Sequence, residues 1–279
     1  MTTTRVKLEW PHDGVALLTL TDTAPNHNLT CAGVSELADR LAEARESGAR
    51  VAVLASGVPG HWYEHAFLDD IRNLVGGRAA SGDPAGWARS LHEVSRQNVV
   101  TIAAITGNTS GGGCELGWGC DLRVAEQGVL FSQPEVIIGC GTGIGGTSRL
   151  MRLIGRTVTA EAVLMGQPLS AERLYQLGGV NRLVEKGQAL STALAMAAHM
   201  ARLPPVALAG MKRMLTEDED LHLSAALDND QAISQTLFAD SLTVSNMAAF
   251  QQRFDAGESL EDAYFGGRRD GTPIEGTRT

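Results

Sequence analysis

Residues 111–115 read GGGCE, and residues 133–135 read QPE. The glycines come shortly after Val99–Ile105, an apolar run typical of a buried strand. Because glycine lacks a Cβ atom, such a run lets the chain turn tightly and present bare N–H groups to a ligand. If a helix begins there, these donors also lie at its positive end. The two stretches together supply backbone donors and two carboxylates, Glu115 and Glu135, which indicates a candidate active site.

The composition favours one large domain, or one domain with a smaller appendage. Of 279 residues, 43% are hydrophobic but only 5% are aromatic, so small aliphatic residues must fill most of the core. The net charge of −9 argues against nucleic acid or a membrane surface as a partner. The four cysteines lack CxxC or secreted spacing, the N-terminus lacks a signal-peptide pattern, and no apolar run could span a bilayer. We therefore expect a cytoplasmic protein.

Strand and helix patterns alternate through the first two thirds of the chain. Strands are predicted at 4–10, 15–20, 51–56, 99–106, 121–125 and 129–132, and helices at 30–47 with Thr30 as its cap, 68–75, 87–97 and 147–154. The stretch 76–86 (GGRAASGDPAG) is rich in helix breakers and is predicted to be a mobile loop. From about residue 187 onward only amphipathic helices follow. These patterns predict a mixed α/β core of repeated strand–strand–helix units at 1–200 and a helical C-terminal region at 201–279.

Several long blocks of the sequence carry a family resemblance. They include VALLTL at 15–20, VAVLAS at 51–56, VTIAAITGNTSGGGCELGWGCDLRVA at 100–125, FSQPEVIIGCGTGIGGTSRLMRLIGR at 131–156, MGQPLSAERLYQLGGVNRLV at 165–184 and NMAAFQQRF at 246–254. On these blocks the chain resembles the crotonase, or enoyl-CoA hydratase/isomerase, superfamily, from roughly residue 5 to 257. The resemblance implies an α/β fold, the crotonase-like spiral, with a helical C-terminal region that forms a homotrimer or a homohexamer.

The resemblance also implies a ligand and a set of catalytic residues. The ligand is an acyl-CoA thioester, whose carbonyl oxygen is held by the backbone N–H groups of Gly112 and Ala66. Glu115 and Glu135 match the two glutamates with which the family's hydratases add water to a double bond, one accepting a proton and the other delivering one. No metal and no separate cofactor is implied, since coenzyme A is part of the substrate. The glycines of the loop 139–146 are expected to shape the acyl pocket.

The segment that carries Ala66 departs from the family pattern. His65 stands where the family has glycine and Phe67 where it has an acid. His65 is either a third acid–base group or an exposed loop residue, and Trp118, one turn after Glu115, is either a wall of the acyl pocket or part of the core. Arginines at 72, 78 and 89 are candidates for the CoA phosphates. The substrate-binding candidates are Glu64, His65, Phe67, Leu68, Trp118, Gly143 and, across a subunit boundary, Phe250.

These observations favour a hydro-lyase that adds water to a 2-enoyl-CoA. Two alternatives stay open. The first is another crotonase chemistry, either double-bond isomerisation or hydrolysis of a carbon–carbon bond, with His65 as an extra base. The second is a non-catalytic protein that binds acyl-CoA, which the altered segment at residues 65–67 suggests.

Overall fold

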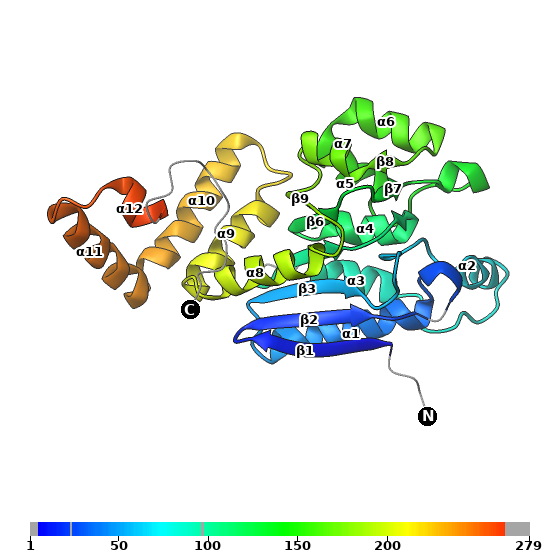
Figure 1. The fold of residues 1–279 in the computed structure, drawn as a ribbon, viewed down its shortest axis with the longest axis horizontal. Helices are drawn as coiled ribbons and strands as arrows, with labels where there is room; N and C mark the ends of the chain where they lie inside the picture. Colours follow the sequence, from blue (N-terminus) through cyan, green and yellow to red (C-terminus); the bar gives the residue numbers. More distant parts are fainter. Residues whose placement is uncertain (1–4, 23, 96–97, 266–279) are drawn as a thin grey trace.

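A computed structural model describes residues 5–22, 24–95 and 98–265 (Figure 1). Six strands form the main sheet in the order β1-β2-β3-β4-β6-β9. Their bounds are β1 Val6–His12, β2 Val15–Leu20, β3 Val51–Ser56, β4 Val100–Ile105, β6 Leu122–Glu126 and β9 Arg182–Val184. The first pair is antiparallel and every later neighbour is parallel. Parallel pairing requires a crossover between successive strands, and helices supply most of these crossovers.

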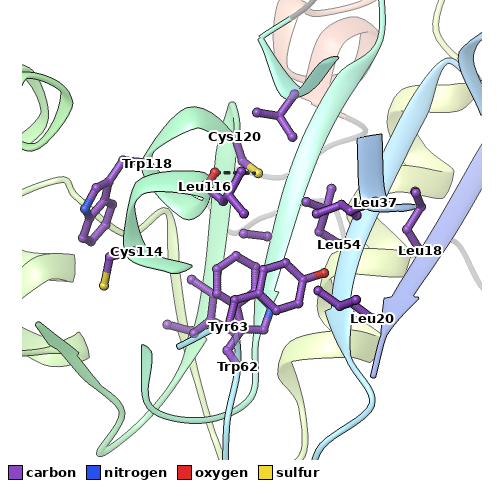
Figure 2. Packing of buried hydrophobic residues seen from close by; sticks show 14 of the residues in the cluster. Leu18, Leu20, Leu37, Leu54, Trp62, Tyr63, Cys114, Leu116, Trp118 and Cys120 are labelled. Atoms are coloured by element: carbon purple, nitrogen blue, oxygen red, sulfur yellow. Dashed lines mark hydrogen bonds between the residues drawn. The ribbon is translucent and has the colours of Figure 1, made fainter. Parts of the chain in front are cut away.

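Both faces of this sheet are covered, which explains why β3 and β4 are continuous apolar runs without polar alternation. Helices α1 (Cys31–Glu46) and α3 (Gly86–Val94) pack against each other on one side, and α8 (Ala189–Ala201) covers the other. Successive residues of a strand point to opposite faces. Accordingly, Leu54 joins the cluster under α1, while Val53 joins the cluster under α8. Figure 2 shows the first cluster, in which the Trp62 and Tyr63 rings stack with centroids 4.1 Å apart.

A second, three-stranded sheet holds the segment that carries the glycine run. Its strands are β5 Thr109–Ser110, β7 Leu130–Ser132 and β8 Leu169–Ser170. Helix α4 (Gly111–Gly119) begins directly after β5, and all of its residues are buried. Around it lie α5 Gly146–Ile154, α6 Arg156–Met165 and α7 Ala171–Gln176. The glycine run thus starts a buried helix, as its sequence indicates.

From residue 201 to residue 265, the described part of the C-terminal region contains helices and no strand. They are α9 Pro205–Glu217, α10 Leu223–Phe238, α11 Ser241–Asp255 and α12 Leu260–Phe265. Figure 1 places α11 and α12 at the end of the molecule opposite to α2 (Leu68–Val75). Buried Lys212 ties α9 to the sheet, because its Nζ donates to the carbonyl oxygens of Val94 and Val99 and lies 2.8 Å from the carboxylate of Asp121. None of the helices that the structure describes is long and apolar enough to cross a membrane.

The predicted fold class is confirmed, and most predicted elements lie within one or two residues of the observed ones. The Thr30 hydroxyl caps α1 by accepting a hydrogen bond from the Gly33 N–H at 2.9 Å, as expected. The helix predicted at 87–97 begins at Gly86 and ends at Val94, and residues 96–97 lie outside the described residues. Residues 76–85 form turns and irregular backbone between α2 and α3.

One close approach of two backbones joins the start of α4 to the segment 62–66. The N–H of Gly113 donates to the carbonyl oxygen of Glu64 at 3.1 Å. A Cβ atom at position 113 would lie only 1.7 Å from the carbonyl oxygen of Tyr63. This oxygen also accepts a 2.5 Å hydrogen bond from Thr109 Oγ1. No side chain fits between the two segments, so position 113 requires glycine.

We expect Gly113→Ala to destabilise the protein by more than about 3 kcal/mol or to prevent folding, because the clash is with backbone rather than with a flexible side chain. Gly141→Ala is the matched control, since a Cβ atom there meets nothing within 4 Å. Urea unfolding followed by circular dichroism measures both variants. Equal stability of the two variants would contradict this packing.

Candidate active site

Both predicted glutamates line one cavity, with a volume of about 640 Å³. The cavity lies between α2, the first turn of α4 and the 3-10 helix η2 (Glu135–Ile138). Its lining residues are His65, Ala66, Leu68, Ile71, Leu74, Pro84, Trp87, Gly111, Gly112, Glu115, Pro134, Glu135, Ile137, Ile138, Cys140, Gly141, Gly143 and Ile144. The structure therefore brings together the two sequence blocks that the motif analysis singled out.

Glu115 is almost fully buried, with 4% of its surface exposed. Its Oε1 accepts hydrogen bonds from the backbone N–H groups of Ile144 at 2.9 Å and Gly146 at 2.7 Å, where α5 begins. Burial raises the pKa of the Glu115 carboxyl, and these backbone donors oppose that effect because they stabilise the charged form. The loop 139–146 thus orients a carboxylate in addition to lining the cavity with Gly143.

Glu135 is held from the other side by two buried residues. With its amide oriented to satisfy both neighbours, Gln133 donates to Glu135 Oε1 at 2.8 Å and accepts from Trp118 Nε1 at 3.2 Å. Burial raises the pKa of Glu135, and the charge of Glu115 raises it further, whereas His65 lowers it. The charge of Glu115 therefore favours the protonated form of Glu135.

Two backbone N–H groups are available beside these carboxylates. Ala66 pairs with Leu29 in a single parallel bridge, in which Leu29 N donates to His65 O and Phe67 N donates to Leu29 O. The Ala66 N–H therefore points away from Leu29. Gly112 lies in the first turn of α4, where N–H groups have no partner within the helix. Within the described part of the chain, neither N–H group has an acceptor, and both residues line the cavity.

Trp87 is a site residue that the sequence did not reveal. A Cβ atom on Gly112 would lie 2.6 Å from Cη2 of the Trp87 ring, so the indole packs directly on the backbone of Gly112. Its Nε1 is buried and has no hydrogen-bond partner among the described residues. Trp87 comes from α3, beyond the breaker-rich stretch, and no local pattern in the sequence connects it with residue 112.

Three of the predicted substrate-binding residues are not among the residues that line the cavity, and their role in binding stays a prediction. Trp118 stacks on Phe131 with ring centroids 5.3 Å apart and reaches the site only through Gln133. Glu64 accepts a 2.6 Å hydrogen bond from Ser110 Oγ, so its side chain binds the residue that directly precedes the glycine run. Phe67 is the residue before α2 and supplies that helix with its N-cap position.

The other predicted residues are placed as follows. His65, Leu68 and Gly143 line the cavity, and His65 Nδ1 donates to the carbonyl oxygen of Ala66 at 2.8 Å. Phe250 lies on α11, where it stacks on Tyr264, and its predicted role across a subunit boundary stays a prediction. The candidate arginines bind neighbouring surface residues: Arg72 pairs with Asp69, Arg78 donates to Asn73, and Arg89 pairs with Asp39 and Asp83.

Comparison with known proteins assigns the chain to a family. Residues 11–256 match the family described as enoyl-CoA hydratase/isomerase. The chain therefore belongs to this family, within the crotonase superfamily. Membership supports an enzyme with crotonase-type chemistry.

Individual relatives agree with this assignment. The 2,3-dehydroadipyl-CoA hydratase of Escherichia coli is 34% identical over 170 residues, which cover 61% of this chain and 65% of that protein. The short-chain-enoyl-CoA hydratase of Clostridium acetobutylicum is 32% identical over 152 residues, covering 54% of this chain and 58% of the relative. A solved enoyl-CoA hydratase from Mycobacterium tuberculosis superposes with a TM-score of 0.78 at 28% identity, covering 90% and 97% of the two chains. The matched regions thus span less than two thirds of the length of either relative.

The raised pKa of Glu115 has a consequence for stability. A carboxyl whose pKa is higher in the folded than in the unfolded protein costs stability as the pH rises through the folded pKa. Glu115→Gln removes this cost, so we expect the stability of the variant relative to the wild-type protein to increase as the pH rises from pH 4, below the unfolded pKa, to pH 8. Urea unfolding at the two pH values measures the change.

Glu161→Gln serves as the control for this measurement. Arg173 lowers the pKa of the exposed Glu161, so ionisation of this carboxyl does not disfavour the folded state. Its replacement should give no gain in relative stability as the pH rises. A Glu115→Gln variant that behaved in the same way would contradict the raised pKa.

Proposed function

We propose that the protein adds water across the 2,3 double bond of a 2-enoyl-CoA thioester. The observation that carries the proposal is the convergence of Glu115, Glu135 and the unpartnered N–H groups of Ala66 and Gly112 on one cavity. Family membership supports it, since the two relatives described above are both named as hydratases. Their names specify different acyl groups, so membership alone does not define the acyl chain.

The two backbone donors suit the thioester carbonyl. When water adds to the β carbon, negative charge develops on the carbonyl oxygen as an enolate. Two donors fixed in place beforehand stabilise that charge without reorganisation, and the loss of one such donor typically costs about 3–4 kcal/mol of barrier. Gly112 is fixed by its position at the start of α4, and Ala66 by its bridge to Leu29.

The surroundings of the carboxyls assign their roles. Two backbone N–H groups stabilise Glu115 as the anion, whereas the charge of Glu115 favours the protonated form of Glu135. Glu115 then accepts a proton from the water molecule while the water oxygen attacks the β carbon. Glu135 delivers its own proton to the α carbon. The two transfers leave the pair with the same total number of protons, and a proton passing from Glu115 to Glu135 restores the starting state. Gln133 keeps Glu135 oriented for this transfer.

Each glutamate should be essential to the reaction. We expect Glu115→Gln and Glu135→Gln to lower kcat for crotonyl-CoA hydration by about 10²–10⁴-fold, because each removes one acid–base group. Loss of the conjugated thioester absorbance measures the rate, and the product should gain the mass of one water. Glu161→Gln, on the exposed surface of α6, is the control and should keep full activity. Unchanged activity in either site variant would argue for a different mechanism.

A second chemistry rests on His65, which also lines the cavity. Its Nδ1 donates to Ala66 O, so its Nε2 is the free acceptor of the ring. Isomerisation or carbon–carbon hydrolysis with His65 as the base would make His65→Ala as harmful as the glutamate variants. Hydration should survive this substitution. Binding of acyl-CoA without turnover of any enoyl-CoA would instead favour a non-catalytic role.

We also propose that the protein assembles into trimers or hexamers. Large apolar side chains are left exposed on α6, α9 and α10, among them Leu164, Leu215 and Leu223, each at least 73% exposed. Exposed apolar surface of this extent is typical of subunit interfaces. Light scattering of the purified protein should give three or six times the chain mass of 29.5 kDa. A monomer would contradict the proposal.

A further inference from the structure

We propose that the acyl group processed here is an uncharged hydrocarbon chain and that the cavity rejects acyl groups ending in a carboxylate. This inference rests on the proposed hydratase function and names its substrate class. It is carried by the side chains around the cavity, beyond the two glutamates and the backbone donors.

Large apolar side chains from two elements line the cavity. Helix α2 contributes Leu68, Ile71 and Leu74, which are 44%, 41% and 36% exposed. The 3-10 helix η2 contributes Ile137 and Ile138, which are 69% and 58% exposed. Large apolar groups left this open beside a reactive centre gain favourable burial when an apolar ligand covers them. The walls therefore match a hydrocarbon chain.

The described lining of the cavity has no lysine or arginine that could pair with a carboxylate at the end of an acyl chain. The histidine of the lining, His65, lies at the reacting end, because its Nδ1 is bonded to the carbonyl oxygen of Ala66. A terminal carboxylate would be surrounded by apolar groups and would share the cavity with Glu115 and Glu135. A buried charge without a partner is strongly unfavourable.

Two arginines close in sequence to the lining residues of α2 have other partners. Arg72, the neighbour of Ile71 on α2, pairs with Asp69 at 2.9 Å and is largely exposed. Arg78 donates its Nε–H to Asn73 at 3.1 Å. Neither residue lines the cavity. The cavity therefore differs from one built to recognise a dicarboxylic acyl group, such as 2,3-dehydroadipyl, for which the Escherichia coli relative is named.

A pair of six-carbon substrates tests the inference on the wild-type protein. Trans-2-hexenoyl-CoA and 2,3-dehydroadipyl-CoA share the same reacting group, and only the second carries a terminal carboxylate. We expect kcat/KM for hexenoyl-CoA to exceed that for dehydroadipyl-CoA by at least about 100-fold. Trans-2-octenoyl-CoA should match or exceed hexenoyl-CoA, since each methylene that becomes buried is worth up to about fourfold.

A charge introduced at the apolar wall tests the cause of the preference. Ile71 is 41% exposed, so Ile71→Arg can be accommodated, and its guanidinium would provide the missing partner. Ile71→Gln is the matched control, because it also replaces the apolar side chain but adds no charge. We expect kcat/KM for dehydroadipyl-CoA to be at least about tenfold higher in the arginine variant than in the glutamine variant.

The outcomes separate the two proposals. Equal or faster turnover of dehydroadipyl-CoA by the wild-type protein would overturn the inference while leaving the hydratase function intact. Equal rates for the arginine and glutamine variants would also count against it, since the wall would then not determine the charge preference. No turnover of the hexenoyl, octenoyl or dehydroadipyl thioesters would overturn the hydratase function and the inference together.

Discussion

The backbone of Gly113 lies against the carbonyl oxygen of Tyr63, at a separation that leaves no room for a Cβ atom. The hydrogen bond from Gly113 N to Glu64 O fixes this crossing, and Ser110 strengthens it by binding the side chain of Glu64. Because the crossing joins α4 to the segment 62–66, it determines how the Ala66 and Gly112 N–H groups lie relative to each other. Glu115 follows on the same helix. The positions of both donors and of one carboxylate thus depend on one close contact between backbones.

The environment of the two carboxyls then divides their tasks. Burial raises both pKa values, yet Glu115 receives two backbone N–H groups at the start of α5, whereas Glu135 faces the charge of Glu115. The loop 139–146, rich in glycine, can bring its N–H groups this close because it carries few side chains. Gln133 and Trp118 hold Glu135 from the core side. The protein therefore keeps two acidic groups in one apolar cavity and gives them different hydrogen-bonding and charge environments.

Local patterns in the sequence predicted most of the fold. The apolar runs at 51–56 and 99–106 became neighbouring parallel strands, and the glycines at 111–113 began a buried helix. The motifs also led to Glu115 and Glu135, which do share a cavity. The sequence did not reveal the contacts between distant segments. Trp118 follows Glu115 by one helical turn, but its ring stacks on Phe131. The ring that packs on Gly112 is instead that of Trp87, on α3. Side-chain direction and packing partners of this kind are set by tertiary structure, which periodicity does not encode.

A crystal structure of the protein with an unreactive 2-enoyl-CoA analogue would test the central claim most directly. The account predicts the thioester oxygen at about 2.7–3.1 Å from both the Ala66 and Gly112 nitrogens, with a water molecule held between Glu115 and Glu135 beside the β carbon. A thioester bound away from these two N–H groups, or carboxyls that do not meet at a common water, would contradict it.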